Sequence, residues 1–426
     1  MIDARALAGR TFRSLRVRNY RLYFLGQVVS LTGTWMQSVA QSWLVLRLTG
    51  SGVALGITTA LQFGPMLVGG PWGGVLADRS NKRKVLIATQ SAAALIALTL
   101  GLLVVTGAVR LWMVYLLAFL LGSVTLVDMP TRQSFVMEMV GRDEVANAVS
   151  LNSVQVNAAR ILGPAAAGLL IAALGTGVCF LINAGSYAAV IAGLLLMDPD
   201  RLHRGARVAR GRGQLRAGLK YVWTTPGLRT PLLMMLVVGT LAYNFSVVMP
   251  LLARFTFGRG AGTFGVLYAL MGSGAVLGGL TVATRGRTSQ RLLSIAALAF
   301  GLALWLAAVA PNLIWEMALM VPTGAASAAF IASSNSLLQL ASTPEMRGRV
   351  MALFAVVFVG STPIGGPLVG WIAERFGARV SLMVAASATI AVGVAGWTAL
   401  RRAARRVRRL RTETLTEPDV TAAVPR

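Results

Sequence analysis

Two ionisable side chains lie inside otherwise apolar stretches of this chain, where a charge is costly and usually serves a function. Asp128 stands near the end of the stretch 111–130, and Arg160 lies within the stretch 147–172. An arginine beside an aspartate holds the carboxylate ionised until a proton competes for it. The two residues therefore predict a proton-linked switch, in which an Asp128–Arg160 pair opens when Asp128 is protonated.

Simpler interpretations of the same residues stay open. Asp128 precedes Pro130 and stands four residues before Arg132. It could therefore cap a helix that breaks at the proline, or form a local pair on one helix face. Arg160 stands four residues before Pro164, so it could serve backbone carbonyls that the proline leaves without a partner.

The composition identifies the environment of these charges. Of 426 residues 56% are hydrophobic and 13% charged, about half the charged fraction of a soluble domain, and the mean hydropathy is +0.69. Apolar stretches long enough to cross a hydrocarbon core recur along the whole chain. We predict an all-α membrane protein with twelve transmembrane helices, at about 22–46, 53–77, 85–107, 111–130, 147–172, 177–197, 230–253, 262–284, 292–310, 313–338, 350–372 and 379–400.

Lysine and arginine fall mainly in alternate loops. Of the 40 such residues, 33 lie in segments on the same side as the N-terminus and six in the loops on the other side. Because positive loops stay in the cytoplasm, both termini are expected there. The net charge of +26 is spread over these loops without a DNA-binding motif, so anionic lipid headgroups, and not nucleic acid, are the expected partner.

The chain divides into two related halves. A shift of 202 residues places Gly163 and Gly168 on Gly365 and Gly370. Two related six-helix bundles around a central site are typical of alternating-access transporters. We expect a cytoplasmic N-terminal segment (1–21), an N-terminal bundle (22–197), a cytoplasmic linker (198–229), a C-terminal bundle (230–400) and a basic cytoplasmic tail (401–426).

The linker contains its own amphipathic segment. In GQLRAGLKYVW, at 213–223, one helical face carries Leu215, Leu219, Val222 and Trp223. This pattern favours a helix that lies in the cytoplasmic membrane interface, and a solvated linker is the alternative.

The segment GVLADRSNKR, from Gly74 to Arg83, closely resembles the G-x-x-x-D-R-x-G-R-R signature between helices two and three of the major facilitator superfamily. Asp78, at a helix end, can meet the positive N-terminus of a helix in the other bundle, and the basic side chains can contact anionic headgroups. The resemblance implies a conformational latch formed by Gly74, Asp78, Arg79, Lys82 and Arg83. Ala283 stands at the matching position of the second half, so we expect a one-sided latch.

Further segments extend the resemblance over nearly the whole chain. Ser150 followed by ARILGPAAAG, at 159–168, is similar to a weakened form of the motif of antiporters in this superfamily, which implies a helix bend at Gly163, Pro164 and Gly168. Ordinary packing of small residues is the alternative. RNYRLYFLGQVV, PTRQSFVMEMVGRDEVANAVSLN and LKYVWTTPGLR resemble the bacterial enterobactin-exporter-like and macrolide-efflux-like branch. That resemblance implies proton-driven export of a small amphipathic molecule across the inner membrane.

Helices one and seven carry the candidates for a substrate cavity, although packing between helices has an equal claim on them: Gln27, Trp35, Gln37, Tyr243 and Asn244. With one cysteine and one histidine in the chain, we expect no metal and no cofactor, and we expect a transporter rather than an enzyme. An importer or a lipid transporter on the same fold, or a membrane enzyme or signalling protein, remain alternatives. The sequence does not indicate the oligomeric state.

Overall fold

The computed structural model describes residues 12–203, 214–285 and 288–416, with side chains given except at 71–72, 75, 77–78, 214–217 and 402–416. Within these ranges the regular secondary structure is helical. The α-helices are α2 (Arg18–Thr49), α3 (Gly52–Arg79), α4 (Lys82–Val105), α5 (Leu111–Leu174), α6 (Thr176–Leu195), α7 (Gln214–Thr224), α8 (Pro226–Ala242), α9 (Phe245–Leu251), α10 (Ala261–Arg285), α11 (Gln290–Ala308), α12 (Leu313–Ala341), α13 (Pro344–Gly360), α14 (Thr362–Phe376) and α15 (Ala378–Thr416). Short turns of other helix types occur at Arg13–Arg16, Pro199–Arg201 and Leu252–Thr256.

Ten helical segments of the described chain are long and apolar enough to cross a membrane. One of them, α5, holds two crossings, because Gly141 at a φ of 71° interrupts its 64 residues. Helix α2 is long enough at 32 residues, but polar side chains lower its hydropathy. Helices α8 and α9 form one broken crossing, as do α13 and α14. The structure confirms the predicted all-α membrane fold.

The fourth crossing is longer than expected. The sequence predicts an end near Pro130, yet the helix runs on to Gly141. A proline removes the hydrogen bond to the carbonyl four residues earlier, here that of Leu126. That carbonyl faces Gly73 of α3, where a Cβ would lie only 2.3 Å from the oxygen. The glycine thus leaves room for the free carbonyl, and the helix continues past the proline.

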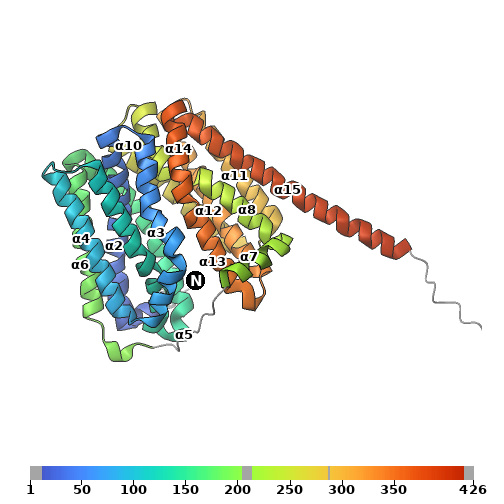
Figure 1. The fold of residues 1–426 in the computed structure, drawn as a ribbon, viewed down its shortest axis with the longest axis horizontal. Helices are drawn as coiled ribbons and strands as arrows, with labels where there is room; N and C mark the ends of the chain where they lie inside the picture. Colours follow the sequence, from blue (N-terminus) through green and yellow to red (C-terminus); the bar gives the residue numbers. More distant parts are fainter. Residues whose placement is uncertain (1–11, 204–213, 286–287, 417–426) are drawn as a thin grey trace, which may run out of the picture.

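Two bundles make up the molecule. Figure 1 shows α2, α4 and α6 on one side and α8, α11 and α12 on the other, with α3 and α14 side by side between them. We call the face from which α2 starts, and on which α7 lies, the terminal face. The opposite face carries the turns at Gly50, Gly175 and Gly377, each with a positive φ.

Glycines bring the two bundles into close contact along two seams. In the first seam, a Cβ on Gly56 of α3 would lie 2.4 Å from the carbonyl oxygen of Gly366 on α14. In the second, a Cβ on Gly265 of α10 would lie 2.8 Å from the Cα of Gly168 on α5. Residues without side chains allow helix backbones to approach this closely. Both contacts lie in the half of the molecule nearer the opposite face.

Helix α7 in the linker packs against the C-terminal bundle. Val222 is buried at 3% exposure, whereas Leu219 and Trp223 are 52% and 57% exposed. The Tyr221 hydroxyl accepts a hydrogen bond of 3.3 Å from the backbone N–H of Thr343. The predicted apolar face is therefore divided, because Val222 faces the protein. The side chain of Leu215 lies outside the described residues.

Candidate functional site

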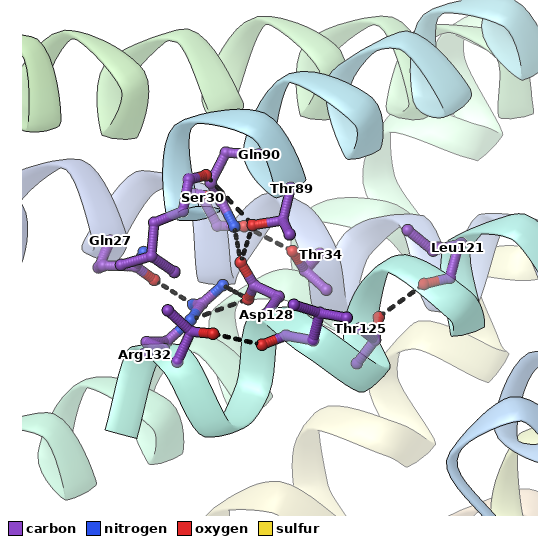
Figure 2. A network of polar contacts seen from close by, with 12 residues as sticks. Gln27, Ser30, Thr34, Thr89, Gln90, Leu121, Thr125, Asp128 and Arg132 are labelled. Atoms are coloured by element: carbon purple, nitrogen blue, oxygen red, sulfur yellow. Dashed lines mark hydrogen bonds and ion pairs between the residues drawn. The ribbon is translucent and has the colours of Figure 1, made fainter. Parts of the chain in front are cut away.

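A network of charged and polar side chains surrounds Asp128 inside the N-terminal bundle (Figure 2). One carboxylate oxygen accepts hydrogen bonds from Thr89 Oγ1 at 2.7 Å and Gln90 Nε2 at 2.8 Å, both on α4. The other accepts from Arg132 Nε at 3.1 Å and Nη2 at 2.5 Å. The remaining arm of Arg132 donates to Gln27 on α2. The carboxylate thus links three helices of one bundle.

The ion-pair partner of Asp128 is Arg132, not Arg160. Residues four apart lie on one helix face, so this pair forms within α5 itself. The expected Asp128–Arg160 pair is not formed in this structure, and the local-pair interpretation is confirmed. The capping interpretation is wrong, because the helix continues through Pro130. The side chain of Asp128 is 9% exposed and that of Arg132 is 23% exposed.

This arrangement can respond to a proton. A carboxylate with four donors is fully engaged as an anion. Protonation removes the charge that Arg132 neutralises and leaves the acid with a hydrogen that needs an acceptor. The Oε1 atom of Gln90 is buried without a hydrogen-bond partner, so rotation of this amide would supply that acceptor. Arg132 would then donate to a neutral carboxyl oxygen instead of an anion, so the ion pair within α5 would be lost, and the hydrogen bond between Asp128 and Gln90 would reverse its direction.

Arg160 lies elsewhere, at the boundary between the bundles. Its guanidinium carbon is 5.1 Å from the centroid of the Trp35 ring, and its buried Nε has no hydrogen-bond partner. Among the described residues its side chain donates to no carbonyl. The carbonyl that Pro164 leaves free is that of Arg160 itself, and it faces Gly272 of α10, whose Cβ would lie 3.0 Å from it. The predicted service of Arg160 to loosened carbonyls is therefore not observed.

The antiporter-like motif fills two packing sites on α5. A Cβ on Gly163 would lie 2.5 Å from the Cβ of Trp35 on α2, within the same bundle. Across the boundary, the carbonyl oxygen of Pro164 would lie 2.5 Å from a Cβ on Gly265, and Gly168 faces the same helix. Small residues are thus required on both sides of this helix.

Three of the five predicted cavity residues pack between helices instead. Gln27 accepts from Arg132, Gln37 accepts a 2.6 Å hydrogen bond from Asn183, and the Asn244 amide donates to the Thr240 carbonyl at 2.7 Å. All three side chains are nearly inaccessible, at 2–3% exposure. Helix packing, the alternative interpretation, explains Gln27 and Gln37, whereas the Oδ1 atom of Asn244 is buried without a hydrogen-bond partner.

The other two predicted cavity residues lie in different places. Trp35 lies at the bundle boundary with Arg160, and its ring packs beside that of Tyr268, with centroids 6.2 Å apart. Tyr243 packs within the C-terminal bundle, against Phe300 and Phe358, and its hydroxyl donates to the carbonyl of Ser327 at 2.7 Å.

A small polar cavity between the bundles includes none of these five predicted residues. It measures about 40 Å³, room for a few water molecules. Its lining comes from α2, α3 and α9: Ser38, Gln41, Ser42, Leu55, Thr58, Thr59, Gln62, Phe63 and Ser246. The sequence pattern that indicates this cavity is the spacing of polar residues three and four apart on α2 and α3, which places them on one face of each helix.

The basic residues of the latch motif are engaged within the N-terminal bundle. Lys82 forms an ion pair with Glu138 of α5. Arg83 Nε donates to the Leu194 carbonyl of α6 at 2.6 Å. These two side chains are thus held by protein partners instead of standing free for headgroups, while Arg79 is exposed. Gly74 is half-buried, and the side chain of Asp78 lies outside the described residues.

A second copy of the latch motif lies on α14. The pattern G-G-P-x-x-G-x-x-A-[DE]-R occurs at 69–79 and again at 365–375, where Glu374 takes the place of Asp78. Glu374 accepts hydrogen bonds from the Ser51 hydroxyl at 2.5 Å and the Val53 N–H at 3.0 Å. It therefore meets the N-terminus of α3 from the other bundle. The expectation of a one-sided latch concerns the terminal face, where Ala283 matches Asp78, and it stays a prediction. Glu374 forms its contact on the opposite face.

Two helical bundles that meet at glycine seams, with a buried ion pair inside one of them, define a secondary transporter of the major facilitator type. The model of the family described as transmembrane secretion effectors matches residues 9–425. The chain belongs to this family and is a multi-pass transporter of the inner membrane.

Similar proteins of known function cover most of the chain. The multidrug efflux pump Tap of Mycolicibacterium fortuitum is 26% identical over 85% of this chain and 91% of its own. The staphyloferrin A transporter of Staphylococcus aureus is 23% identical, over 87% and 94%. The enterobactin exporter EntS of Shigella flexneri is 26% identical, over 87% and 88%.

Solved structures share the fold at low sequence identity. The nucleoside transporter NupG matches with a TM-score of 0.71 and 12% identity, over 90% of this chain and 98% of its own. A bacterial homologue of the human lysosomal transporter Spinster matches with a TM-score of 0.69 and 15% identity, over 88% and 93%.

Proposed function

We propose that this protein exports a small amphipathic molecule, of the drug or siderophore type, in exchange for protons. Relatives named as a multidrug efflux pump, a staphyloferrin A transporter and an enterobactin exporter support the substrate type. The proton is the coupling ion of the proposal because the N-terminal bundle contains a buried carboxylate.

The Asp128 network carries the proposal of proton coupling. An intramembrane carboxylate is costly and marks a proton or ion pathway by default. Asp128 is buried and bound on both oxygens, and the same carboxylate ties α5 to α4 directly and to α2 through Arg132 and Gln27. Protonation would loosen this link inside the bundle. In the proposed cycle Arg132, in place of Arg160, is the counter-ion that the proton displaces.

The distribution of close contacts supports an alternating-access cycle. The glycine seams lie in the half nearer the opposite face, so this conformation is closed on that side. Because the positive loops belong to the terminal face, we assign that face to the cytoplasm, and the conformation is inward-facing. The motif at Gly74 to Arg83 would close the cytoplasmic side in the outward-facing conformation, with Asp78 at the N-terminus of α13.

The membrane surface is a further proposed partner. Arg79 on the latch turn, and Leu219 and Trp223 on α7, are exposed on the terminal face. Basic and apolar side chains exposed on one face of the protein suit the headgroup region of an anionic membrane. Lipids would thus contact the elements that move in the cycle.

Transport into inverted membrane vesicles tests the function. Vesicles with the protein should accumulate a fluorescent drug or a siderophore when the interior is made acidic, and a protonophore should abolish accumulation. Vesicles without the protein supply the background. Accumulation that survives the protonophore would contradict proton coupling, and an absence of transport for every probe would contradict export of this substrate type.

A further inference from the structure

Arg160, at the bundle boundary, has no counter-ion among the described residues. The ion pairs of those residues are Arg13–Glu144, Lys82–Glu138, Arg132–Asp128 and Arg201–Asp198. Arg160 takes part in none of them. It is half-buried, and its Nε is fully buried without an acceptor. A charge in such a place is unfavourable unless an opposite charge or hydrogen bonds compensate it.

The contrast with Arg132 shows that the fold is able to satisfy a buried guanidinium. Arg132 gives two hydrogen bonds to Asp128 and one to Gln27. Arg160 has only the face of Trp35, at 5.1 Å. A cation–π contact occupies the flat face of the guanidinium and leaves its N–H edge for another ligand. The N–H groups on the edge of the Arg160 guanidinium are thus hydrogen-bond donors that have no acceptor among the described residues.

Aromatic side chains from both bundles surround this donor set. Trp35 comes from α2, and Tyr268 comes from α10 with its ring centroid 6.2 Å from that of Trp35. One cation beside aromatic faces suits a ligand with one acidic group on a planar apolar body.

We propose that Arg160, flanked by Trp35 and Tyr268, binds the acidic group of the exported molecule, a carboxylate or an ionised phenol attached to an aromatic body. This inference rests on the proposed function and specifies the substrate class. Because the site takes residues from both bundles, its occupation would bias the equilibrium between the two conformations. It would also supply the counter-ion that the described part of the protein does not provide.

A matched pair of ligands tests the charge. Binding of 2-naphthoate and of its neutral amide, 2-naphthamide, is measured by calorimetry on the purified full-length protein, at neutral pH and without a proton gradient. The wild type should bind the acid at least about tenfold more tightly than the amide, the effect expected for a charge-assisted hydrogen bond. Equal affinity for the two ligands would overturn the proposal.

Variants then separate the charge from the aromatic contact. Arg160→Gln should abolish the preference for the acid, whereas Trp35→Ala should lower the affinity for both ligands to the same extent. Arg259→Gln, at an exposed arginine of the opposite face, is the matched control and should keep the preference. Thermal unfolding of each variant identifies any that fails to fold. A folded Arg160→Gln protein that still prefers the acid would contradict the proposal.

Two further measurements distinguish other outcomes. If chloride at about 100 mM removes the preference for the acid, the site is one for inorganic anions and the proposal is wrong. Export itself is tested separately, with the neutral dye Nile red in energised inverted vesicles. Export of the dye together with equal binding of acid and amide would refute the anion site alone. Acid-selective binding without export of any probe would refute the proposed function and leave the site.

Discussion

The carboxylate of Glu374, at the end of α14, accepts a 2.5 Å hydrogen bond from the hydroxyl of Ser51, the residue that caps α3 in the other bundle. The same oxygen accepts from the N–H of Val53. A negative charge at a helix N-terminus is favourable, so this contact closes the opposite face. Its sequence pattern is that of the Asp78 segment, and α3 and α14 are neighbours that run in opposite directions. Each helix thus ends in an acidic residue followed by an arginine, and that of α14 contacts the partner bundle.

Replacing Glu374 should open the opposite face. Because the contact is exposed, we expect Glu374→Gln to weaken closure by no more than about 1 kcal/mol, about fivefold in the conformational equilibrium. Thr58 lines the polar cavity. A Thr58→Cys variant would report the opening of this face as faster labelling by an impermeant maleimide. The native Cys179 is buried and should not compete. Arg375→Gln, at the exposed neighbouring residue, should leave the rate unchanged; an equal increase there would remove the case for Glu374.

The glycine seam gives a sharper test of closure. A Cβ at Gly56 would lie 2.4 Å from the carbonyl oxygen of Gly366, and neither backbone is free to move aside while the seam is closed. Gly56→Ala should therefore cost on the order of 1–3 kcal/mol in the closed conformation and reduce transport at least several-fold. Gly64 lies on the same helix with nothing within 4 Å of its Cβ position. Transport by Gly64→Ala should stay normal, and a similar loss in both variants would show that helix propensity, not the seam, is responsible.

The motif at the terminal face predicts a second conformational effect. If Asp78 holds the cytoplasmic side closed, Asp78→Asn should reduce transport while the amount of protein in the membrane and its thermal stability stay normal. Asp143→Asn changes an exposed carboxylate on the same face and serves as the control. Turnover near the wild-type rate in the Asp78 variant would leave no role for this side chain as a latch.

The linker helix can be divided by two substitutions. Val222 is buried, so Val222→Ser should lower the free energy of unfolding by about 1–3 kcal/mol, measured by thermal unfolding in detergent. Leu219 is exposed, so Leu219→Ser should leave stability unchanged. If α7 lies in the membrane interface, the Leu219 variant should instead slow transport and reduce lipid contact of the helix. A Leu219→Ser variant with a normal transport rate and normal lipid contact of the helix would indicate a solvated linker.

Most of the fold could be predicted, because apolar length alone identifies membrane crossings. The course of α5 could not, since its passage through Pro130 depends on Gly73 of another helix. The local pair of Asp128 with Arg132 follows from a spacing of four residues. The position of Arg160 depends on how the helix is rotated after the turn at Gly141, which no local pattern specifies.

The role of Glu374 was missed for a related reason. Comparison of the two halves aligns helices that occupy equivalent places, whereas the two copies of the latch motif lie on helices that face each other. Their similarity, at 69–79 and 365–375, becomes meaningful only when α3 and α14 are known to be neighbours. Gln37 shows the converse: its polarity suggested a cavity, but it accepts a hydrogen bond from Asn183 within a helix pair.

The Asp128 network leads to the prediction that decides the coupling mechanism. Asp128→Asn keeps the size of the side chain and removes the charge that Arg132 neutralises. We expect this variant to bind substrate normally and to exchange it down a gradient, because the network lies inside one bundle, away from the boundary with Arg160. It should fail to accumulate substrate against a gradient when inverted vesicles are energised by a proton gradient.

A matched carboxylate on the same helix separates coupling from charge. Asp143 is exposed on α5, outside the Asp128 network, so Asp143→Asn should retain proton-driven accumulation. Substrate-induced proton release, followed with a pH-sensitive dye on purified protein, should be lost in Asp128→Asn and kept in Asp143→Asn. Since protonation of Asp128 is the step that removes the ion pair with Arg132, a folded Asp128→Asn protein that still accumulates substrate on a proton gradient would assign coupling to another residue and leave this network a structural role.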